Sequence, residues 1–263
     1  AISVSGTYAT DGKTYNLTKT VTDNIAYLTF NYGNLYTAVK DTGADRTYTM
    51  SADENVAQNL GAMGGTKLTI EGNGHSIEGT VDNGDGTTTS YSGVVATGGQ
   101  TIEFNNVGSY SVTKDADDNI TNVNVNDSVN GFSSVVKKSG SNSTINIKNS
   151  VFSNNNGSSG VVVYSEGTGN VNIENSVFAN NVASSAGIIR NTYRSVLNAT
   201  GDNIFYNNSV SNSGGVLYND STSEEFSNIN GLFLSNHSYG GGAIRNSGKD
   251  RKSTRLNSSH GYI

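Results

Sequence analysis

A motif that recurs four times between residues 142 and 246 constrains the fold more than any other feature of the chain. Each copy reads Asn or Asp, any residue, an aliphatic residue, Phe, two further residues and Asn. The Phe lies at positions 152, 178, 205 and 233. The first three copies end in Asn-Asn, and the fourth ends in Ser-Asn. Eight to ten residues after each Phe comes a Gly, at positions 160, 187, 215 and 242, followed by two aliphatic or small residues. A period near 27 residues with this self-similarity predicts a stack of repeated units.

The aliphatic runs inside each period indicate which units are stacked. There are two short runs per period, rich in Val, Ile and Phe and bounded by Asn, Gly and Ser, and they have the length of strands. The sequence therefore predicts an all-β parallel solenoid, in which each strand pairs with its equivalent one coil further, about 4.8 Å away. Phe then stacks on Phe in the interior. Asn stacks on Asn at the bends, where the side-chain amides bond along the axis.

The spacing of the motif predicts where the coils vary. The distance from each Gly to the next Phe is 18 residues, whereas the distance from Phe to Gly varies between 8 and 10. This pattern predicts that all length variation lies in one turn, so that an insertion after Asn208 is tolerated. A weaker copy precedes the four, with Val125 at the Phe position and Ser134 at the Gly position.

The most complete copy, with Phe-x-x-Asn at residues 233–236 and Gly-Gly-Ala-Ile at residues 241–244, also carries a family resemblance. It resembles the repeat of the chlamydial polymorphic membrane proteins and of other adhesin-like β-helix proteins, over residues 120–248. Two copies depart from the Gly-Gly pair, with Ser159-Gly160 and Ala186-Gly187. The resemblance implies a right-handed parallel β-helix, display at the bacterial cell surface and an adhesive role, as in an autotransporter passenger.

The pattern divides the chain into three segments. Residues 1–66, with alternating Tyr- and Thr-rich stretches, predict an N-terminal β-rich cap of partly antiparallel strands and the first irregular coils. Within this segment Val56, Leu60 and Met63 are spaced by three or four, which predicts one short helix over residues 52–62. Residues 67–248 predict about seven solenoid coils of roughly 26 residues, with a hairpin or bend at residues 82–86.

The last segment, residues 249–263, breaks the pattern. Residues 250–260 contain one apolar residue and no aliphatic alternation, and they resemble a translated sequencing adapter. We therefore expect a non-native disordered tail, with the natural chain continuing past Gly248. A basic tail that binds nucleic acid or a partner is the alternative.

Composition narrows the class of protein. The net charge is −6, and because the last fifteen residues carry +3, residues 1–248 carry −9. This acidic body argues against binding to nucleic acid or to an anionic membrane surface. The chain has no run of 18 apolar residues, so we expect no membrane span. It has no cysteine, which excludes thiol catalysis and cysteine–zinc sites. Hydrophobic residues make up only 33%, which suits a thin, monomeric rod.

Candidate chemistry is sparse. His75 and His237 lie far apart among Gly, Asn and Ser, with no motif of a hydrolase triad around them. Arg190 and Arg245 recur three residues after their Gly, but Val163 and Tyr218 occupy that place in the other two copies. A solvated face is the simplest interpretation, and we expect no catalytic residue.

An acidic turn is the sharpest candidate for a metal site. Asp115, Asp117, Asp118 and Asn119 form an oxygen-rich segment that could bind Ca²⁺, and Asp82 with Asp85 forms a weaker one. The first cluster lacks the Gly and Glu of an EF-hand loop. A plain Asp/Asn turn between strands is the interpretation that we favour, so we expect neither a metal site nor a cofactor.

Three functions remain open. The first is a non-catalytic, surface-exposed or secreted adhesin-like fragment, displayed at the outer membrane, whose turns bind glycans or proteins of host or neighbouring cells. The second is a β-helix lyase or hydrolase of acidic polysaccharides, which would need clustered carboxylates on one face. The coils offer Asn, Ser and Thr there, so we predict that the protein is not an enzyme. The third is a structural spacer.

Overall fold

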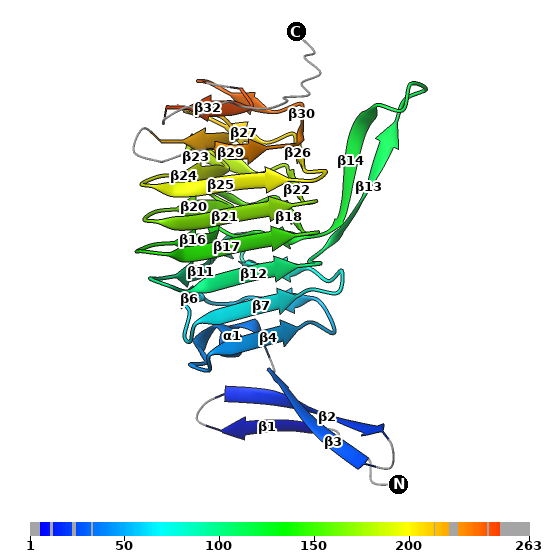
Figure 1. The fold of residues 1–263 in the computed structure, drawn as a ribbon. Helices are drawn as coiled ribbons and strands as arrows, with labels where there is room; N and C mark the ends of the chain where they lie inside the picture. The colour runs from blue at the N-terminus through cyan, green and yellow to red at the C-terminus, as the bar shows by residue number, and fades with distance from the viewer. Residues whose placement is uncertain are drawn as a thin grey trace.

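The computed structural model describes residues 6–10, 13–22, 25–32, 34–212, 214–220, 226–240 and 242–247, and these residues are mostly β-strand. Three parallel sheets of seven strands each stack from Asp45 to Asn246 (Figure 1). The chain enters the three sheets in turn, and each strand pairs with its equivalent from the next coil, where a coil is one pass through the sheets. The prediction of an all-β chain with long parallel sheets is confirmed.

Four parallel sheets are named here by the order of their first strands. Sheet 1 comprises β4 (Asp45–Thr49), β7 (Lys67–Glu71), β12 (Thr101–Asn105), β17 (Ser143–Lys148), β21 (Gly169–Glu174), β25 (Ser195–Thr200) and β29 (Phe226–Ile229). Sheet 2 comprises β5 (Glu54–Asn55), β8 (Ile77–Glu78), β15 (Val129–Asn130), β18 (Val151–Ser153), β22 (Val177–Ala179), β26 (Ile204–Tyr206) and β30 (Leu232–Leu234).

Sheet 3 comprises β6 (Gly61–Ala62), β11 (Ser92–Ala96), β16 (Ser134–Lys138), β20 (Val163–Ser165), β24 (Ile189–Asn191), β28 (Leu217–Asn219) and β32 (Ile244–Asn246). Sheet 4 has four strands, which lie between sheets 2 and 3 along the chain: β19 (Asn156–Ser159), β23 (Val182–Ala186), β27 (Ser209–Val210) and β31 (His237–Ser238).

The interior of sheet 2 carries the predicted phenylalanine stack. Phe152, Phe178, Phe205 and Phe233 pair in register. Consecutive ring centroids lie 5.4, 5.0 and 4.5 Å apart, with interplanar angles of 10°, 11° and 9°. The first three rings are fully buried, and the fourth is 6% exposed. In-register pairing of identical residues explains the stack, because each ring meets its own equivalent one strand spacing away.

Two polar residues turn each corner between sheets 2 and 4. The first has φ between 50° and 56°, the left-handed region that Asn tolerates better than most residues, and it is Asn154, Asn180, Asn207 or Ser235. The second belongs to a ladder made by Asn155, Asn181, Asn208 and Asn236, of which the first three are buried. In this ladder each Nδ2 donates to the Oδ1 of the next coil, at 3.0, 3.0 and 2.9 Å. The prediction of stacked asparagines at the bends is confirmed.

A second asparagine ladder closes sheet 3. Asn191 donates from Nδ2 to Oδ1 of Asn219 at 2.9 Å, and Asn219 donates to Asn246 at 3.0 Å. The ladder begins at Asn191 because Ser165 occupies the equivalent place one coil earlier. Among the described residues, the buried Oδ1 of Asn191 consequently has no hydrogen-bond donor.

The prediction that one turn holds all length variation is wrong. Val163, the first residue of β20, pairs with Ile189, the first residue of β24. The strand β20 therefore begins three residues after Gly160, whereas β24 begins two residues after Gly187. The turn from sheet 1 to sheet 2 is then one residue longer in the later coil, residues 201–203 against 175–176. The later start of β20 after its Gly and the shorter turn that follows β21 cancel each other, so the distance from Gly to the next Phe is 18 residues in both coils. Asn208 is also followed directly by β27, whose Val210 is buried, so an insertion is better tolerated after Val210.

Two hairpins interrupt the regular coils. The predicted bend at residues 82–86 joins β9 (Thr80–Asp82) to β10 (Thr88–Ser90), which pair antiparallel. A longer hairpin, β13 (Ser109–Lys114) with β14 (Ile120–Asp127), leaves the stack between β12 and β15. The placement of Val125 at the Phe position is wrong, because Val125 lies in this hairpin and Val129 pairs with Phe152 instead. An inserted hairpin displaces the period, which the repeat spacing alone does not reveal.

The N-terminal segment contains the predicted antiparallel strands. They are β1 (Gly6–Thr10), β2 (Lys13–Thr22) and β3 (Ile25–Tyr32), which form one antiparallel sheet. The helix α1 spans Leu35–Lys40 and lies beside β4 (Figure 1), and its Leu35, Ala38 and Val39 join the main hydrophobic core. Within residues 1–66, β4, β5 and β6 already pair parallel with the strands of the next coil.

The helix predicted over residues 52–62 is wrong, because β5 and β6 occupy this stretch. Val56, Leu60 and Met63 are buried as expected. They enter the core where the chain bends between short strands, and this produces the spacing of three or four without a helix. The helix lies earlier in the chain, where the backbone N–H of Thr37 donates to Asn34 Oδ1 at 2.8 Å and so caps α1.

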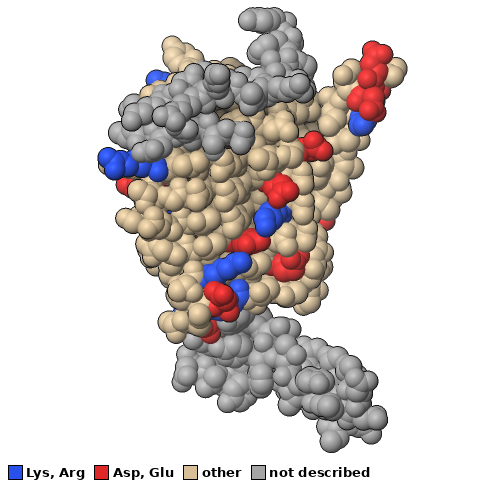
Figure 2. All heavy atoms as spheres, in the orientation of Figure 1, with Lys and Arg blue, Asp and Glu red and all other residues tan. Residues whose placement is uncertain are grey.

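The charged side chains of sheet 1 form a short outward-facing ladder. Glu103 forms ion pairs with Lys67, at 3.4 Å, and with Lys148, at 3.5 Å. Figure 2 shows acidic and basic side chains alternating across the lower part of this face, with largely uncharged surface above them. Among the described residues, no helix has the length and hydropathy that crossing a bilayer requires. The tail predicted for residues 249–263 lies outside the described residues.

Lys138 is a fully buried cation in the core, where its Nζ donates to the backbone carbonyl of Thr168 at 3.1 Å. Burial lowers its pKa from 10.5 to about 8, because the charged form loses its hydration. A lysine with a lowered pKa in the folded state destabilises that state most below pH 8, and this cost disappears as pH rises past the unfolded pKa.

We therefore expect Lys138→Met to stabilise the protein at neutral pH. Its advantage over the natural chain should be about 3 kcal/mol larger at pH 7 than at pH 11, from about 1.4 kcal/mol per unit of pKa. Urea unfolding of both proteins at the two pH values measures this difference, and the exposed Lys114→Met is the control. An advantage that does not change with pH would show that Lys138 keeps an ordinary pKa.

Candidate functional site

The hairpin β13–β14 is the largest departure from the repeat and lies beside sheet 2 (Figure 1). It replaces the turn from sheet 1 to sheet 2, which elsewhere is as short as residues 149–150. Insertions in a solenoid concentrate on the surface that it uses for binding, because the stack itself tolerates little change. The hairpin is therefore the first place to look for a site.

The middle of the hairpin packs against the outer face of sheet 2. Val123 is buried against Val151, Val177 and Ala179, which makes a second apolar cluster outside the solenoid core. The alternation of apolar residues along β13 and β14 produces this packing, since every second side chain points to the same face. The hydroxyl of Tyr206, in β26, also donates to Asn122 Oδ1 at 2.6 Å. These contacts fix the hairpin on sheet 2.

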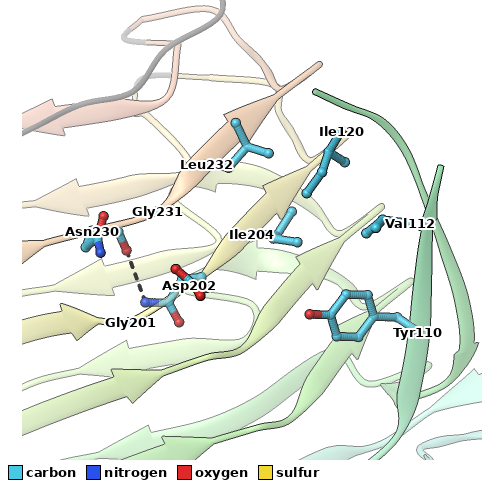
Figure 3. A pocket seen from close by; sticks show the side chains of 10 residues that line it. Tyr110, Val112, Ile120, Gly201, Asp202, Ile204, Asn230, Gly231 and Leu232 are labelled. Atoms are coloured by element: carbon cyan, nitrogen blue, oxygen red, sulfur yellow. Dashed lines mark hydrogen bonds between the residues drawn. The ribbon is translucent and has the colours of Figure 1, made fainter. Parts of the chain in front are cut away.

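A groove of about 370 Å³ lies where the hairpin separates from the later coils. Tyr110, Val112 and Ile120 line it from the hairpin, and Ile204 and Leu232 line it from sheet 2 (Figure 3). The turns at residues 201–203 and 230–231 complete its wall. A concave, mostly apolar site of this size with a few polar groups is typical of ligand-binding pockets.

The polar groups of the groove come from two successive turns between sheets 1 and 2. Asn203 donates from Nδ2 to the backbone carbonyl of Asn230 at 3.1 Å, which ties the turns together. The backbone N–H of Asp202 donates to Asn175 Oδ1 at 2.9 Å, which fixes the position of Asp202. Both Asp202 and Asn230 are exposed at the groove. Asp202 is the single charged residue among the described residues that line it.

The acidic segment that suggested Ca²⁺ lies at the tip of the hairpin, where Figure 2 shows a cluster of acidic side chains. Asp115 Oδ1 accepts hydrogen bonds from the backbone N–H of Asn119 at 2.9 Å and of Asp117 at 3.0 Å. These bonds lower the pKa of Asp115, the bonds from Asn119 most strongly. Asp118 pairs with Lys114 at 2.9 Å. The carboxylate thus closes the turn, as a plain Asp/Asn turn requires.

The weaker acidic pair behaves similarly. Asp82 accepts from the N–H of Gly84 at 2.8 Å, and Asp85 accepts from the N–H of Thr87 at 2.9 Å. The Thr87 hydroxyl and N–H lower the pKa of Asp85. Among the residues that the structure describes, no group of three or more His, Cys, Asp and Glu side chains could hold a metal ion.

The two histidines lie far apart in the stack. His75 precedes β8, near the N-terminal end of sheet 2, and its Nδ1 lies 3.3 Å from Asp53 Oδ1. His237 is exposed in β31, the last strand of sheet 4. The pairing of His75 with Asp53 joins residues of adjacent coils, so no local motif could indicate it. The nearby Ser76 hydroxyl donates to Asp127 instead of to His75, so the residues do not form a hydrolase triad.

Arg190 and Arg245 lie on the outer face of sheet 3, in a stack that alternates cations with tyrosines. Lys137 and Arg190 lie 4.9 and 5.4 Å from the ring centroid of Tyr164, and Arg190 and Arg245 lie 5.8 and 5.3 Å from that of Tyr218. The sequence comparison of Arg190 with Val163 is wrong by one residue, because Arg190 pairs with Tyr164.

This cation–tyrosine stack is largely neutralised. Lys137 pairs with Glu166 at 3.2 Å, and Arg190 pairs with Asp220 at 3.2 Å. The cations lie over the tyrosine rings, which leaves those ring faces occupied. The stack therefore stabilises sheet 3 through cation–π contacts, and the groove beside the hairpin is the stronger candidate for a binding site.

Comparisons of the chain with protein-family models, with curated proteins and with solved structures found no match. The resemblance to adhesin-like repeats thus depends on the repeat residues themselves. The function proposed for this chain therefore depends on the groove beside the hairpin and on the stacked parallel sheets that carry it.

Proposed function

We propose that this chain is a non-catalytic binding fragment, exposed on a cell surface or secreted, in which a right-handed parallel β-helix of about seven coils displays the β13–β14 hairpin. Its ligands are glycans or proteins of host or neighbouring cells. The observation that carries the proposal is the hairpin itself, which departs from an otherwise regular stack and closes a groove over sheet 2. The resemblance to adhesin-like repeats supports the surface location.

The chemistry of the groove favours binding over catalysis. Glycoside hydrolysis uses two carboxyl groups, one as acid and one as base or nucleophile, on either side of the bond that breaks. The described groove residues include one carboxylate, that of Asp202. The cations of sheet 3 are engaged with tyrosines and carboxylates. A binding role uses what the groove presents: an apolar floor and a few polar groups at its mouth.

Binding to cells tests the proposal. We expect the purified chain to bind cells or a panel of glycans and matrix proteins. Deleting the hairpin, residues 108–127, leaves Asn106 and Val107 as a two-residue turn equivalent to residues 149–150, and this should abolish that binding while the melting transition persists. Shortening the β9–β10 hairpin is the matched control and should leave binding unchanged.

Two outcomes would contradict the proposal. The first is an absence of binding across the panel, which would favour a spacer. The second is the release of reducing ends or unsaturated products from uronic-acid polymers, which would favour a polysaccharide-degrading enzyme. If the shortened chain does not fold, Ile120→Lys, a charge placed in the groove, replaces it as the test variant.

A further inference from the structure

We infer that the groove between the β13–β14 hairpin and sheet 2 binds a neutral sugar ring, either free or as part of an uncharged glycan. This inference rests on the proposed function, whose ligand class it specifies. The groove volume of about 370 Å³ is suited to a small ring and excludes a folded domain. A sugar ring has an apolar face of C–H bonds and a polar edge of hydroxyl groups, and the groove has an apolar side and a polar side that match them.

The apolar side comes from one aromatic and four aliphatic side chains, of which Val112 and Ile120 lie on the hairpin beside Tyr110. Tyr110 is 39% exposed and is the one tyrosine among the described residues that line the groove, and its hydroxyl points toward the turn at Gly201 and Asp202 (Figure 3). A pyranose has a face of C–H bonds, which carry a small positive charge and pack against the negative face of an aromatic ring. Ile204 and Leu232 extend this apolar surface on the opposite wall. Among the described residues, no cation lies over the ring of Tyr110, whereas cations lie over the rings of Tyr164 and Tyr218.

The polar side comes from Asp202 and Asn230. The Asp202 carboxylate accepts hydrogen bonds only, whereas the Asn230 side-chain amide both donates and accepts. A sugar hydroxyl also donates and accepts, so neighbouring hydroxyls can donate to Asp202 and accept from Asn230. Both residues are exposed, and the bonds at Asn175 and Asn203 fix the turns that hold them. The groove therefore offers hydroxyl partners at fixed positions next to an apolar surface.

Charge decides between neutral and acidic sugars. Among the described residues, Asp202 is the one charged group that lines the groove, and the hairpin tip adds Asp115 and Asp117, while Asp118 pairs with Lys114. A uronate or sialate would bring a second negative charge beside Asp202, and no cation is among the described residues that line the groove, which disfavours its binding. A cationic peptide would be attracted to the negative charge of Asp202. It would, however, not supply neighbouring hydroxyl groups that hydrogen-bond to both Asp202 and Asn230. The groove thus favours uncharged hydroxylated rings.

Binding of simple glycosides tests the inference. The probes are the methyl α-pyranosides of glucose, mannose and galactose, with glucuronic acid and a lysine-containing peptide as comparisons, and Kd is measured by ligand-observed NMR or calorimetry. We expect saturable binding of at least one neutral glycoside, unchanged by added salt because no ion pair forms. Tyr110→Ala should weaken it about tenfold or more, as the loss of an aromatic anchor does.

Two further variants sharpen the test. Asp202→Asn should weaken the neutral glycoside and reduce the discrimination against glucuronic acid, which a purely structural role of Asp202 would not do. Tyr239→Ala removes a ring that is 85% exposed outside the groove and should leave Kd unchanged. Melting temperatures of all variants establish that they fold.

The outcomes separate the ligand class from the proposed function. Tighter binding of glucuronic acid or of the peptide than of every neutral glycoside would overturn the inference. So would hairpin-dependent binding of the chain to cells without binding of any neutral glycoside, and the proposed function would then stand. A chain that binds neither cells nor glycosides would contradict both.

Discussion

Phe178→Ala is expected to lower the free energy of unfolding by about 3–5 kcal/mol, the usual cost of emptying a large aromatic site in a core. Phe178 is fully buried between Phe152 and Phe205, with ring centroids 5.4 and 5.0 Å away. The two neighbouring rings are held in register by their own strands, so they cannot close the cavity without breaking strand pairing. Urea or thermal unfolding measures the loss.

The matched control for this change is a tyrosine outside the core. Tyr239 is 85% exposed, and its replacement by alanine should change stability by less than about 0.5 kcal/mol. A comparable loss in the two variants would mean that the phenylalanine stack is not the interior of the solenoid.

Asn181→Ala is expected to cost roughly 2–6 kcal/mol, because it leaves buried groups without partners at about 1–3 kcal/mol each. Asn181 Oδ1 accepts from the backbone N–H of Asn155 at 3.1 Å, and its Nδ2 donates to the backbone carbonyl of Phe152 at 3.0 Å. The site is fully buried, so water cannot replace these bonds. Unfolding measured at equilibrium should show the loss without a change in secondary structure at low temperature.

A ladder on the surface provides the comparison. Asn172 donates to Asn146 at 2.9 Å and accepts from Asn198 at 3.1 Å, but it lies partly exposed on sheet 1. Water can replace its bonds, so Asn172→Ala should cost less than about 1 kcal/mol. If the surface and buried variants lose the same stability, the ladder at Asn181 is not what holds the corner.

The repeat predicted the parts of the fold that depend on residue identity. Stacked Phe and Asn residues require an in-register parallel arrangement, and both stacks are present. The interruptions were harder to predict. The hairpin β13–β14 alternates polar and apolar residues like any strand pair, so Val125 resembled a core position although it lies outside the solenoid. Register shifts of one residue, as at Val163, also cancelled in the total spacing.

The candidate site could not be read from the sequence because its parts are distant along the chain. Tyr110 and Leu232 are separated by more than one hundred residues and meet only because the hairpin lies along the stack. The recurrence of Arg190 and Arg245 in the repeat indicates part of the cation–tyrosine stack. The alternation of cations with tyrosines follows only from the strand register that the structure shows. Asp115 was singled out correctly as a turn residue, since short polar side chains at such a position satisfy local backbone groups.

Disulfide formation between engineered cysteines tests the stacking of coils most directly, and the chain has no cysteine of its own. Asn146 and Asn172 pair in register on the outer face of sheet 1, and the spacing of about 4.8 Å between paired strands lies within the range that a disulfide spans. We predict that the double variant Asn146→Cys with Asn172→Cys forms an intramolecular disulfide on mild oxidation, detected by peptide mass spectrometry. Asn146→Cys with Asn156→Cys, which places the second cysteine on sheet 4, should remain reduced. A disulfide in the second pair but not in the first would contradict the parallel solenoid on which the groove and the binding function depend.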